Sequence, residues 1–215
     1  MALSGLVVDW GGVLTIGMRE AMGAWVAEES LDVDAYIGVM REWLGPEYGL
    51  EAAYNPIHAL EKGELEVPQF EQHLAAALSA RMGQRIEPDG LLRRMFRYFH
   101  NSPDMISLVR RAREHGIRTA LLSNSWGDNY PDDLFDGMFD AVVISGRVGM
   151  RKPDPQIFEY TLSELRLPAE QCVFVDDLLP NVHAARALGF VAVHHTDYPT
   201  TAEELDALFG RTLSR

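Results

Sequence analysis

The chain has 215 residues, and its 32 acidic and 19 basic residues give a formal net charge of −13. So acidic a protein lacks the basic face that nucleic-acid backbones require, which excludes nucleic acid as the expected partner. Hydrophobic residues make up 47% and charged residues 24%, so we expect a folded protein. The length exceeds one average domain and falls short of two, which predicts a main domain with a sizeable insertion.

Cysteine content and hydropathy indicate the compartment. The single cysteine, Cys172, cannot form an internal disulfide, and the apolar run after it predicts a buried strand position. The first residues carry no positive charge, and Asp9 interrupts their apolar stretch, unlike a signal peptide. No segment approaches the roughly 20 apolar residues of a membrane span. We therefore expect a soluble, cytoplasmic protein without a membrane partner.

Five short apolar runs are each typical of a strand buried on both faces. They are residues 6–10, 117–122, 141–144, 172–175 and 191–194. Between the first two runs, from about residue 15 to residue 100, apolar residues such as Met18, Met22 and Trp25 repeat at helical spacing instead. We interpret this interval as an all-helical insert whose methionine and aromatic stripes form its own core. The predicted division is an α/β core of residues 1–14 and 101–215 and a helical domain of residues 15–100.

The segments between the later runs carry helix start and stop signals. Pro103 and Pro155 each follow an N-cap residue, and Gly189 ends a helix that begins near Pro180. Residues 201–204, Thr-Ala-Glu-Glu, are typical of a capping box and predict the start of the last helix. The alternation of strand and helix predicts an α/β fold with a doubly wound, parallel, Rossmann-like sheet.

In an open parallel sheet, ligands bind beyond the carboxyl ends of the strands. Polar segments follow the first four predicted strands, at residues 9–15, 123–126, 149–155 and 176–181. If the sheet forms as expected, they bring a carboxylate, small hydrogen-bond donors, a cation and an acidic pair into one crevice. Phosphoryl transfer through an aspartyl-phosphate requires such a set.

The motifs of these segments resemble those of a known superfamily. Asp9-x-Gly-Gly-Val-Leu, Leu122-Ser123-Asn124, Lys152-Pro153 and Asp176-Asp177-x-x-x-Asn181 resemble the four ordered motifs of the haloacid dehalogenase superfamily. Residues 123–189 are also similar to the N-terminal phosphatase domain of soluble epoxide hydrolases. The helical insert corresponds to the family's cap domain, so the resemblance covers nearly the whole chain.

The resemblance implies a role for each motif residue. Asp9 is the implied nucleophile, Lys152 binds it and the transferring phosphoryl group, and Ser123 helps to hold the phosphoryl oxygens. The implied Mg²⁺ ligands are Asp9, Asp177 and the backbone carbonyl of Gly11. Asp176 orients Lys152 or a water on the metal, with Asn181 in support. The expected substrate-binding set is Gly11, Gly12, Ser123, the backbone amide of Asn124, Trp126 and Lys152.

Two features of the residues themselves agree with these roles. The chain has 17 arginines but only two lysines, Lys62 and Lys152. A lysine at position 152 is therefore unusual for this chain and indicates a specific requirement. Its compact ammonium suits a crowded phosphoryl site better than a planar guanidinium. The adjacent carboxylates of Asp176 and Asp177 repel each other unless a cation relieves them, and Mg²⁺ prefers such oxygen ligands. No histidine spacing typical of a metal site and no glycine-rich nucleotide loop occurs.

The sequence departs from the family pattern at Gly11. Most phosphatases of the superfamily have there a second aspartate, which protonates the leaving oxygen and activates water, an effect of about 10²- to 10⁴-fold. Three explanations are open: substrates with good leaving groups, an acid supplied by the cap or the substrate, or loss of catalysis.

We expect a Mg²⁺-dependent hydrolase, a phosphatase of a small phosphorylated metabolite. One alternative is a 2-haloacid dehalogenase, in which Asp9 attacks carbon and Trp10 and Trp126 line a halide pocket. The acidic pair argues against it, because the resembled dehalogenases work without metal. The other alternative is a catalytically silent binding protein, against which the retained motif residues argue. Substrate identity depends on cap side chains, among them Met18, Arg19, Tyr54 and His58, whose orientation the sequence leaves open, as it does the oligomeric state.

Overall fold

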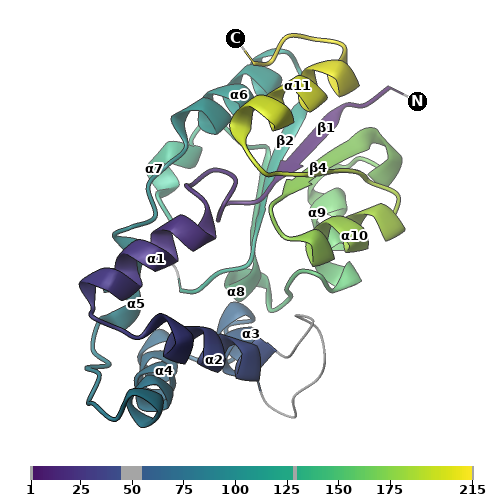
Figure 1. Ribbon diagram of the computed structural model, residues 1–215. Helices are drawn as coiled ribbons and strands as arrows, with labels where there is room; N and C mark the ends of the chain where they lie inside the picture. The colour runs from purple at the N-terminus through teal and green to yellow at the C-terminus, as the bar shows by residue number, and fades with distance from the viewer. Residues whose placement is uncertain (1, 45–54, 128–129, 215) are drawn as a thin grey trace.

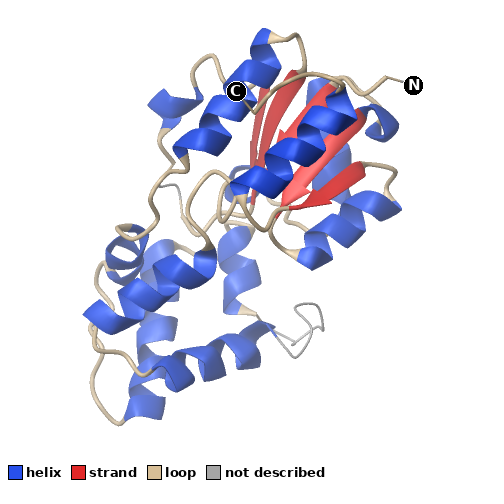
Figure 2. Cartoon of the chain, turned by 45° about the horizontal axis from the view of Figure 1, so that its top comes forward, coloured by secondary structure: helices blue, strands red, loops and turns tan. Residues whose placement is uncertain are grey.

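The computed structural model describes residues 2–44, 55–127 and 130–214. Its centre is a five-stranded parallel sheet in the order β3-β2-β1-β4-β5 (Figures 1 and 2). The strands are β1 (Gly5–Val8), β2 (Arg118–Ser123), β3 (Ala141–Ile144), β4 (Cys172–Asp176) and β5 (Val191–His194). All five predicted strands are confirmed. The order reverses beside β1, which lies between β2 and β4, and ligand crevices form at such a reversal.

Successive residues of each central strand face opposite helical layers, so both faces of the sheet are buried. On one face, Leu6 and Val8 pack with α6 (Pro103–Glu114) and α11 (Tyr198–Phe209). On the other face, Val7 and Phe174 pack with α9 (Pro155–Leu165) and α10 (Leu179–Ala187). The fold is the predicted doubly wound α/β sheet. Short elements complete it: α7 (Asp132–Phe135), α8 (Ser145–Val148) and the 3₁₀ helix η1 (Ala169–Gln171).

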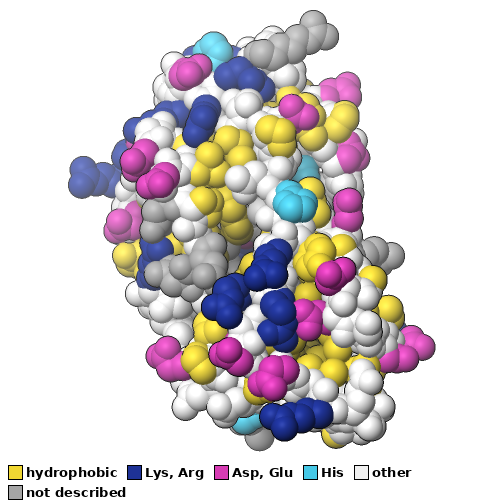
Figure 3. Space-filling view, turned by 90° about the vertical axis from the view of Figure 1, so that its left-hand side faces the viewer, with side chains coloured by type: hydrophobic (Ala, Val, Ile, Leu, Met, Phe, Trp, Pro, Cys, Tyr) yellow, Lys and Arg dark blue, Asp and Glu magenta, His cyan; other side chains and the backbone are white. Residues whose placement is uncertain are grey.

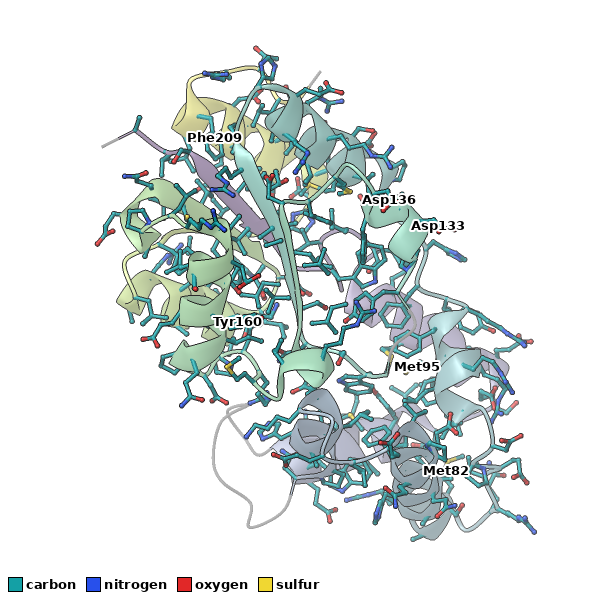
Figure 4. All side chains as sticks on the ribbon, turned by 180° about the vertical axis from the view of Figure 1, so that it is seen from behind. Met82, Met95, Asp133, Asp136, Tyr160 and Phe209 are labelled. Atoms are coloured by element: carbon teal, nitrogen blue, oxygen red, sulfur yellow. The ribbon has the colours of Figure 1, made fainter. Side chains whose placement is uncertain are left out.

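Of the helices that the structure describes between β1 and β2, the first five form a separate layer beyond one end of the sheet (Figure 1). They are α1 (Met18–Glu28), α2 (Val33–Leu44), α3 (Pro56–Glu61), α4 (Val67–Met82) and α5 (Leu91–Phe96). Trp25, Phe70, Leu74 and Met95 are buried among them, and Figure 4 labels Met95 in this layer. The methionine and aromatic stripes therefore form the insert's own core, as predicted, and the insert is a helical cap.

The chain leaves and re-enters the α/β layer at adjacent points. Thr15 and Asn101 form an isolated antiparallel bridge, and the backbone N–H of Ile16 donates to the carbonyl of His100 at 2.8 Å. This two-stranded connection lies close to the predicted boundaries. The division itself, 1–14 with 101–215 for the core and 15–100 for the cap, stays a prediction.

The predicted capping box at 201–204 is wrong. Helix α11 begins at Tyr198, and the Asp197 side chain is its N-cap, accepting from the Thr200 backbone N–H at 2.9 Å. Aspartate is a preferred N-cap, and Pro199 in the first turn favours this earlier start. The Thr201 hydroxyl lies instead 2.8 Å from His195 Nδ1.

The buried position predicted for Cys172 is confirmed, and burial raises the pKa of its thiol to about 12. Within the described ranges, no helix has the length and apolarity needed to cross a membrane. The cytoplasmic location stays a prediction.

Candidate active site

The candidate active site is built around one buried lysine at the carboxyl ends of β1 and β4. Lys152 Nζ lies 2.9 Å from Asp9 Oδ1 and 2.7 Å from Asp176 Oδ2. Asp9 follows β1, and its backbone N–H donates to the carbonyl of Val175 in β4, so the two carboxylates lie at neighbouring strand ends. Lys152 is 1% exposed and Asp176 is fully buried. The structure thus brings together three residues far apart in the chain.

Both carboxylate oxygens of Asp176 accept hydrogen bonds from within the protein. Its Oδ1 accepts from the Leu178 backbone N–H at 2.8 Å and from Asn181 Nδ2 at 3.0 Å. Its Oδ2 accepts from Lys152 Nζ, and Asn181 Nδ2 also lies 3.1 Å from it. Asp176 therefore holds the lysine, while Asn181, in the first turn of α10, holds Asp176. The contacts agree with the expectation that Asp176 orients Lys152 with Asn181 in support, and both roles stay predictions.

The side chain of Asn124 fixes the turn that carries the lysine. Its Nδ2 donates to the Lys152 carbonyl at 2.9 Å, and its Oδ1 accepts from the Lys152 backbone N–H at 2.8 Å. Sequence analysis assigned a role only to the backbone of Asn124 and missed this side-chain clamp. The side-chain amide of asparagine offers a donor and an acceptor side by side, which match the carbonyl and the N–H of one residue's backbone. The motif that contains Asn124 therefore orients the motif that contains Lys152.

Negative charge exceeds positive charge among these side chains. Burial raises the pKa of Asp9 to about 8; Lys152 opposes this shift, whereas Asp176 and Asp177 add to it. Burial and the neighbouring Asp176 raise the pKa of Asp177 to about 6. Burial alone lowers the pKa of Lys152, but Asp176 and Asp9 raise it above its ordinary value, so the lysine is charged. The carboxylates therefore favour an additional cation.

The donor set fits a divalent cation. Asp9, Asp176 and Asp177 each present a carboxylate oxygen within 4.8 Å of the others. Since Asp176 is already engaged by hydrogen bonds, Asp9 and Asp177 are the carboxylates left for the metal. All these donors are oxygen atoms, which Mg²⁺ prefers. The backbone carbonyl of Gly11, in the loop after β1, stays a predicted ligand.

Gly12 makes room for Asp177. A Cβ at this position would lie 2.3 Å from Asp177 Oδ2, and Gly12 has a φ of +77°, in the left-handed region. No other residue type satisfies both conditions without displacing the carboxylate. Gly12 was expected to bind substrate, and the structure adds this packing role.

Ser123 and Trp126 occupy two different environments. Ser123 ends β2 and is buried, with its Oγ 2.8 Å from the hydroxyl of Tyr130. Sequence analysis missed Tyr130, because a single loop tyrosine carries no spacing signal. Trp126 faces the cap instead: its ring packs against Phe70, and its Nε1–H donates to Glu61 Oε1 at 3.3 Å. The substrate-binding role of Trp126 stays a prediction.

A buried glutamate, which sequence analysis also missed, connects the cap to the site. Glu61 ends α3, and its Oε2 accepts from Arg151 Nε at 2.6 Å, one residue before the buried lysine. The Glu61 carbonyl accepts from Ser145 Oγ at 2.5 Å. Burial raises the pKa of Glu61, and Arg151 opposes this shift. The cap is thus joined to the loop that presents Lys152.

Of the cap residues expected to set substrate identity, His58 alone has a described side chain. Its Nε2 is buried and has no hydrogen-bond partner among the described residues. Burial, followed by the nearby Arg151 and Lys62, lowers its pKa to about 4, so the ring is neutral at pH 7. Tyr54 and the side chains of Met18 and Arg19 lie outside the described part of the structure.

Comparison with known proteins identifies the family. A family model described as haloacid dehalogenase-like hydrolase matches residues 3–189. The chain belongs to this family of hydrolases. It is 38% identical over 114 residues to the sesquiterpene phosphatase astK of Aspergillus oryzae, a match that covers 49% of this chain and 56% of that protein. Bifunctional epoxide hydrolase 2 of Mus musculus is 25% identical over 225 residues, which cover 98% of this chain and 39% of that protein.

Solved structures share the fold. An enzyme of the haloacid dehalogenase family from Bacteroides thetaiotaomicron, BT-2542, aligns with a TM-score of 0.65 and 17% identity over 97% of this chain and 99% of that one. Its magnesium complex aligns with a TM-score of 0.66 and 18% identity over 91% and 94% of the two chains. The predicted superfamily and the predicted likeness to the epoxide hydrolase phosphatase domain are both confirmed. The chain nevertheless spans less than two thirds of the length of these two curated relatives.

The packing of Gly12 on Asp177 predicts a specific loss of metal affinity. Gly12→Ala should weaken Mg²⁺ binding about 10- to 100-fold, because the new Cβ displaces a ligand. Its left-handed backbone should also cost roughly 1–2 kcal/mol of stability. Calorimetric titration with Mg²⁺ and urea unfolding measure the two effects.

Gly116→Ala is the matched control for Gly12→Ala. Gly116 has a φ of +79°, but a Cβ there would meet nothing within 4 Å. It should lose similar stability and keep its Mg²⁺ affinity. Equal affinities of the two variants would contradict the packing role of Gly12.

The buried pair between Glu61 and Arg151 predicts a large stability effect. Glu61→Ala leaves a buried guanidinium unpaired and should lower the free energy of unfolding by about 3–5 kcal/mol. The cap pair Glu42–Arg81 is the control, because its side chains are 66% and 39% exposed. Glu42→Ala should cost less than about 1 kcal/mol. Similar urea unfolding curves for both variants would show that the buried pair does not anchor the cap.

Proposed function

We propose that this hydrolase is a Mg²⁺-dependent phosphatase of a small phosphorylated metabolite and acts through an aspartyl-phosphate on Asp9. The observation that carries the proposal is the buried Lys152 between Asp9 and Asp176, with Asp177 beside them. A relative described as a phosphatase and a structural neighbour solved with magnesium support it.

The residues divide the chemistry as follows. Lys152 and the Trp10 backbone N–H both bond Asp9 Oδ1, at 2.9 and 2.7 Å, and orient the carboxylate. An Asp9 oxygen forms the new bond to phosphorus as the bond to the leaving oxygen breaks. Lys152, Ser123 and the Asn124 backbone N–H hold the other phosphoryl oxygens. Water then cleaves the aspartyl-phosphate and releases inorganic phosphate.

In this proposal Asp9, Asp177 and the backbone carbonyl of Gly11 would bind the metal. Mg²⁺ supplies positive charge that offsets the negative charge on the transferring phosphoryl group. This local charge matters because the net charge of −13 repels a phosphate dianion. On the face drawn in Figure 3, basic side chains gather in small clusters among acidic ones, with no continuous basic surface. Lys152 and the metal must therefore attract the substrate at short range.

The absence of a second aspartate narrows the proposed range of substrates. With Gly11 in its place, no carboxylate of the nucleophile loop donates a proton to the leaving oxygen. We infer that the enzyme hydrolyses phosphates with good leaving groups faster than simple alkyl phosphates. Glu61 does not replace the acid, because Arg151 and Trp126 engage its two carboxylate oxygens.

Asp9 and the metal should both be essential. Purified protein should hydrolyse p-nitrophenyl phosphate only with Mg²⁺, and Asp9→Asn should lower kcat by about 10⁴-fold or more, because an amide is a poor nucleophile. Steady-state assays with and without Mg²⁺ test both points. Metal-independent chloride release from 2-chloropropionate would instead indicate dehalogenase chemistry. Inactivity on a broad phosphate panel, without beryllofluoride binding, would indicate a silent binding protein.

The leaving-group argument makes a separate prediction about Gly11. Gly11→Asp should raise kcat/KM for an alkyl phosphate by up to about 10²-fold and change it little for an aryl phosphate. Gly11→Asn, equal in size but without the acid, should not. Equal effects on both substrates would contradict the leaving-group explanation.

A further inference from the structure

Among the residues that the structure describes, the hydroxyl of Ser123 has one close partner. Its Oγ lies 2.8 Å from the Tyr130 hydroxyl and 3.5 Å from the Asn124 carbonyl, the second contact being at the limit of a hydrogen bond. A serine hydroxyl carries one proton and two lone pairs. The direction of the bond to Tyr130 therefore decides whether the serine proton is free for a ligand.

Aromatic packing holds Tyr130 in place independently of this bond. Its ring lies 6.1 Å from Trp10 and 6.2 Å from Phe135, measured between centroids. Trp10 and Phe135 themselves meet edge to face at 5.3 Å. Trp10 directly follows Asp9, so one aromatic cluster joins the loop after β2 to the nucleophile loop. Removing only the hydroxyl of Tyr130 should leave this packing intact.

The 2.8 Å contact allows either hydroxyl to donate, and the chemistry of the two groups favours Tyr130 as the donor. Burial raises the pKa of Tyr130, with Asp9 adding to the shift, so the phenol keeps its proton across the working pH range. A phenol is also a stronger donor than an aliphatic hydroxyl. With Tyr130 donating, Ser123 accepts on one lone pair and keeps its own proton for an anionic oxygen. Hydrogen bonds in such a chain strengthen one another.

We propose that Tyr130 is a positioning residue for phosphoryl transfer, whose hydroxyl donates to Ser123 Oγ and directs the serine proton toward the transferring phosphoryl group. This assignment rests on the proposed function. Tyr130 acts through Ser123 and does not itself contact the substrate.

A double-mutant cycle with the full chain and Mg²⁺ tests the assignment. Tyr130→Phe should lower kcat/KM for p-nitrophenyl phosphate about 2- to 13-fold, the effect of one net hydrogen bond. It should weaken inhibition by inorganic phosphate to a similar extent. Ser123→Ala should cost more, and adding Tyr130→Phe to it should cost nothing further, because the tyrosine then has no hydroxyl to orient. Ser123→Thr keeps a hydroxyl and should stay sensitive to Tyr130→Phe.

Tyr198→Phe is the matched control. The Tyr198 hydroxyl donates to the Ser214 carbonyl at 2.8 Å, in a bond as short as that of Tyr130 but at the C-terminal helix. This variant should keep the wild-type kcat/KM. Thermal unfolding of each variant separates loss of fold from loss of orientation.

Three results would overturn the assignment. One is an unchanged kcat/KM in Tyr130→Phe, and another is an equal loss from this substitution with and without Ser123. The third is a loss that grows from aryl to alkyl phosphates, which would make Tyr130 the proton donor to the leaving group. Additive losses in an active wild-type background would overturn this assignment alone. An inactive wild-type protein would overturn the proposed function and the assignment together.

Discussion

The ammonium of Lys152, buried between the carboxylates of Asp9 and Asp176, is the interaction on which the site depends. Removing a charged amine from water costs several kcal/mol, and attraction to its partners offsets that cost only when the geometry is good. Both contacts, at 2.9 and 2.7 Å, have good geometry. The sheet makes this possible because adjacent parallel strands end side by side, placing Asp9 and Asp176 at one edge. Lys152 lies in a turn outside the sheet, so contacts other than strand pairing must hold it in place.

Those contacts come from each of the other motifs. Asn124 clamps the backbone of Lys152, and Asn181 and the Leu178 backbone N–H hold Asp176. The cap contributes through Glu61, whose carboxylate holds the neighbouring Arg151. A charge pair therefore joins the cap to the loop that presents the lysine, in addition to apolar packing.

The site favours the binding of a cation because its carboxylates carry more negative charge than Lys152 balances. Asp9, Asp176 and Asp177 lie together against one lysine, and burial raises the pKa values of Asp9 and Asp177. A divalent cation between Asp9 and Asp177 would favour their charged forms. The overall charge of −13 thus opposes an anionic ligand, and under the proposed function Lys152 and the bound metal would offset this charge locally.

The sequence by itself determined the sheet and the all-helical insert, and it predicted that Asp9, Lys152 and the acidic pair come together, because apolar runs and motifs at strand ends are local signals. It placed the cap of the last helix four residues too late, at Thr201 in place of Asp197, since both residue types are acceptable caps. Tertiary structure alone decided the clamp from Asn124, the buried pair between Glu61 and Arg151, and the contact of Tyr130 with Ser123. Glu61 and Arg151 are 90 residues apart in the chain. No local pattern marks such a pair, because its partners meet only when the cap packs on the core.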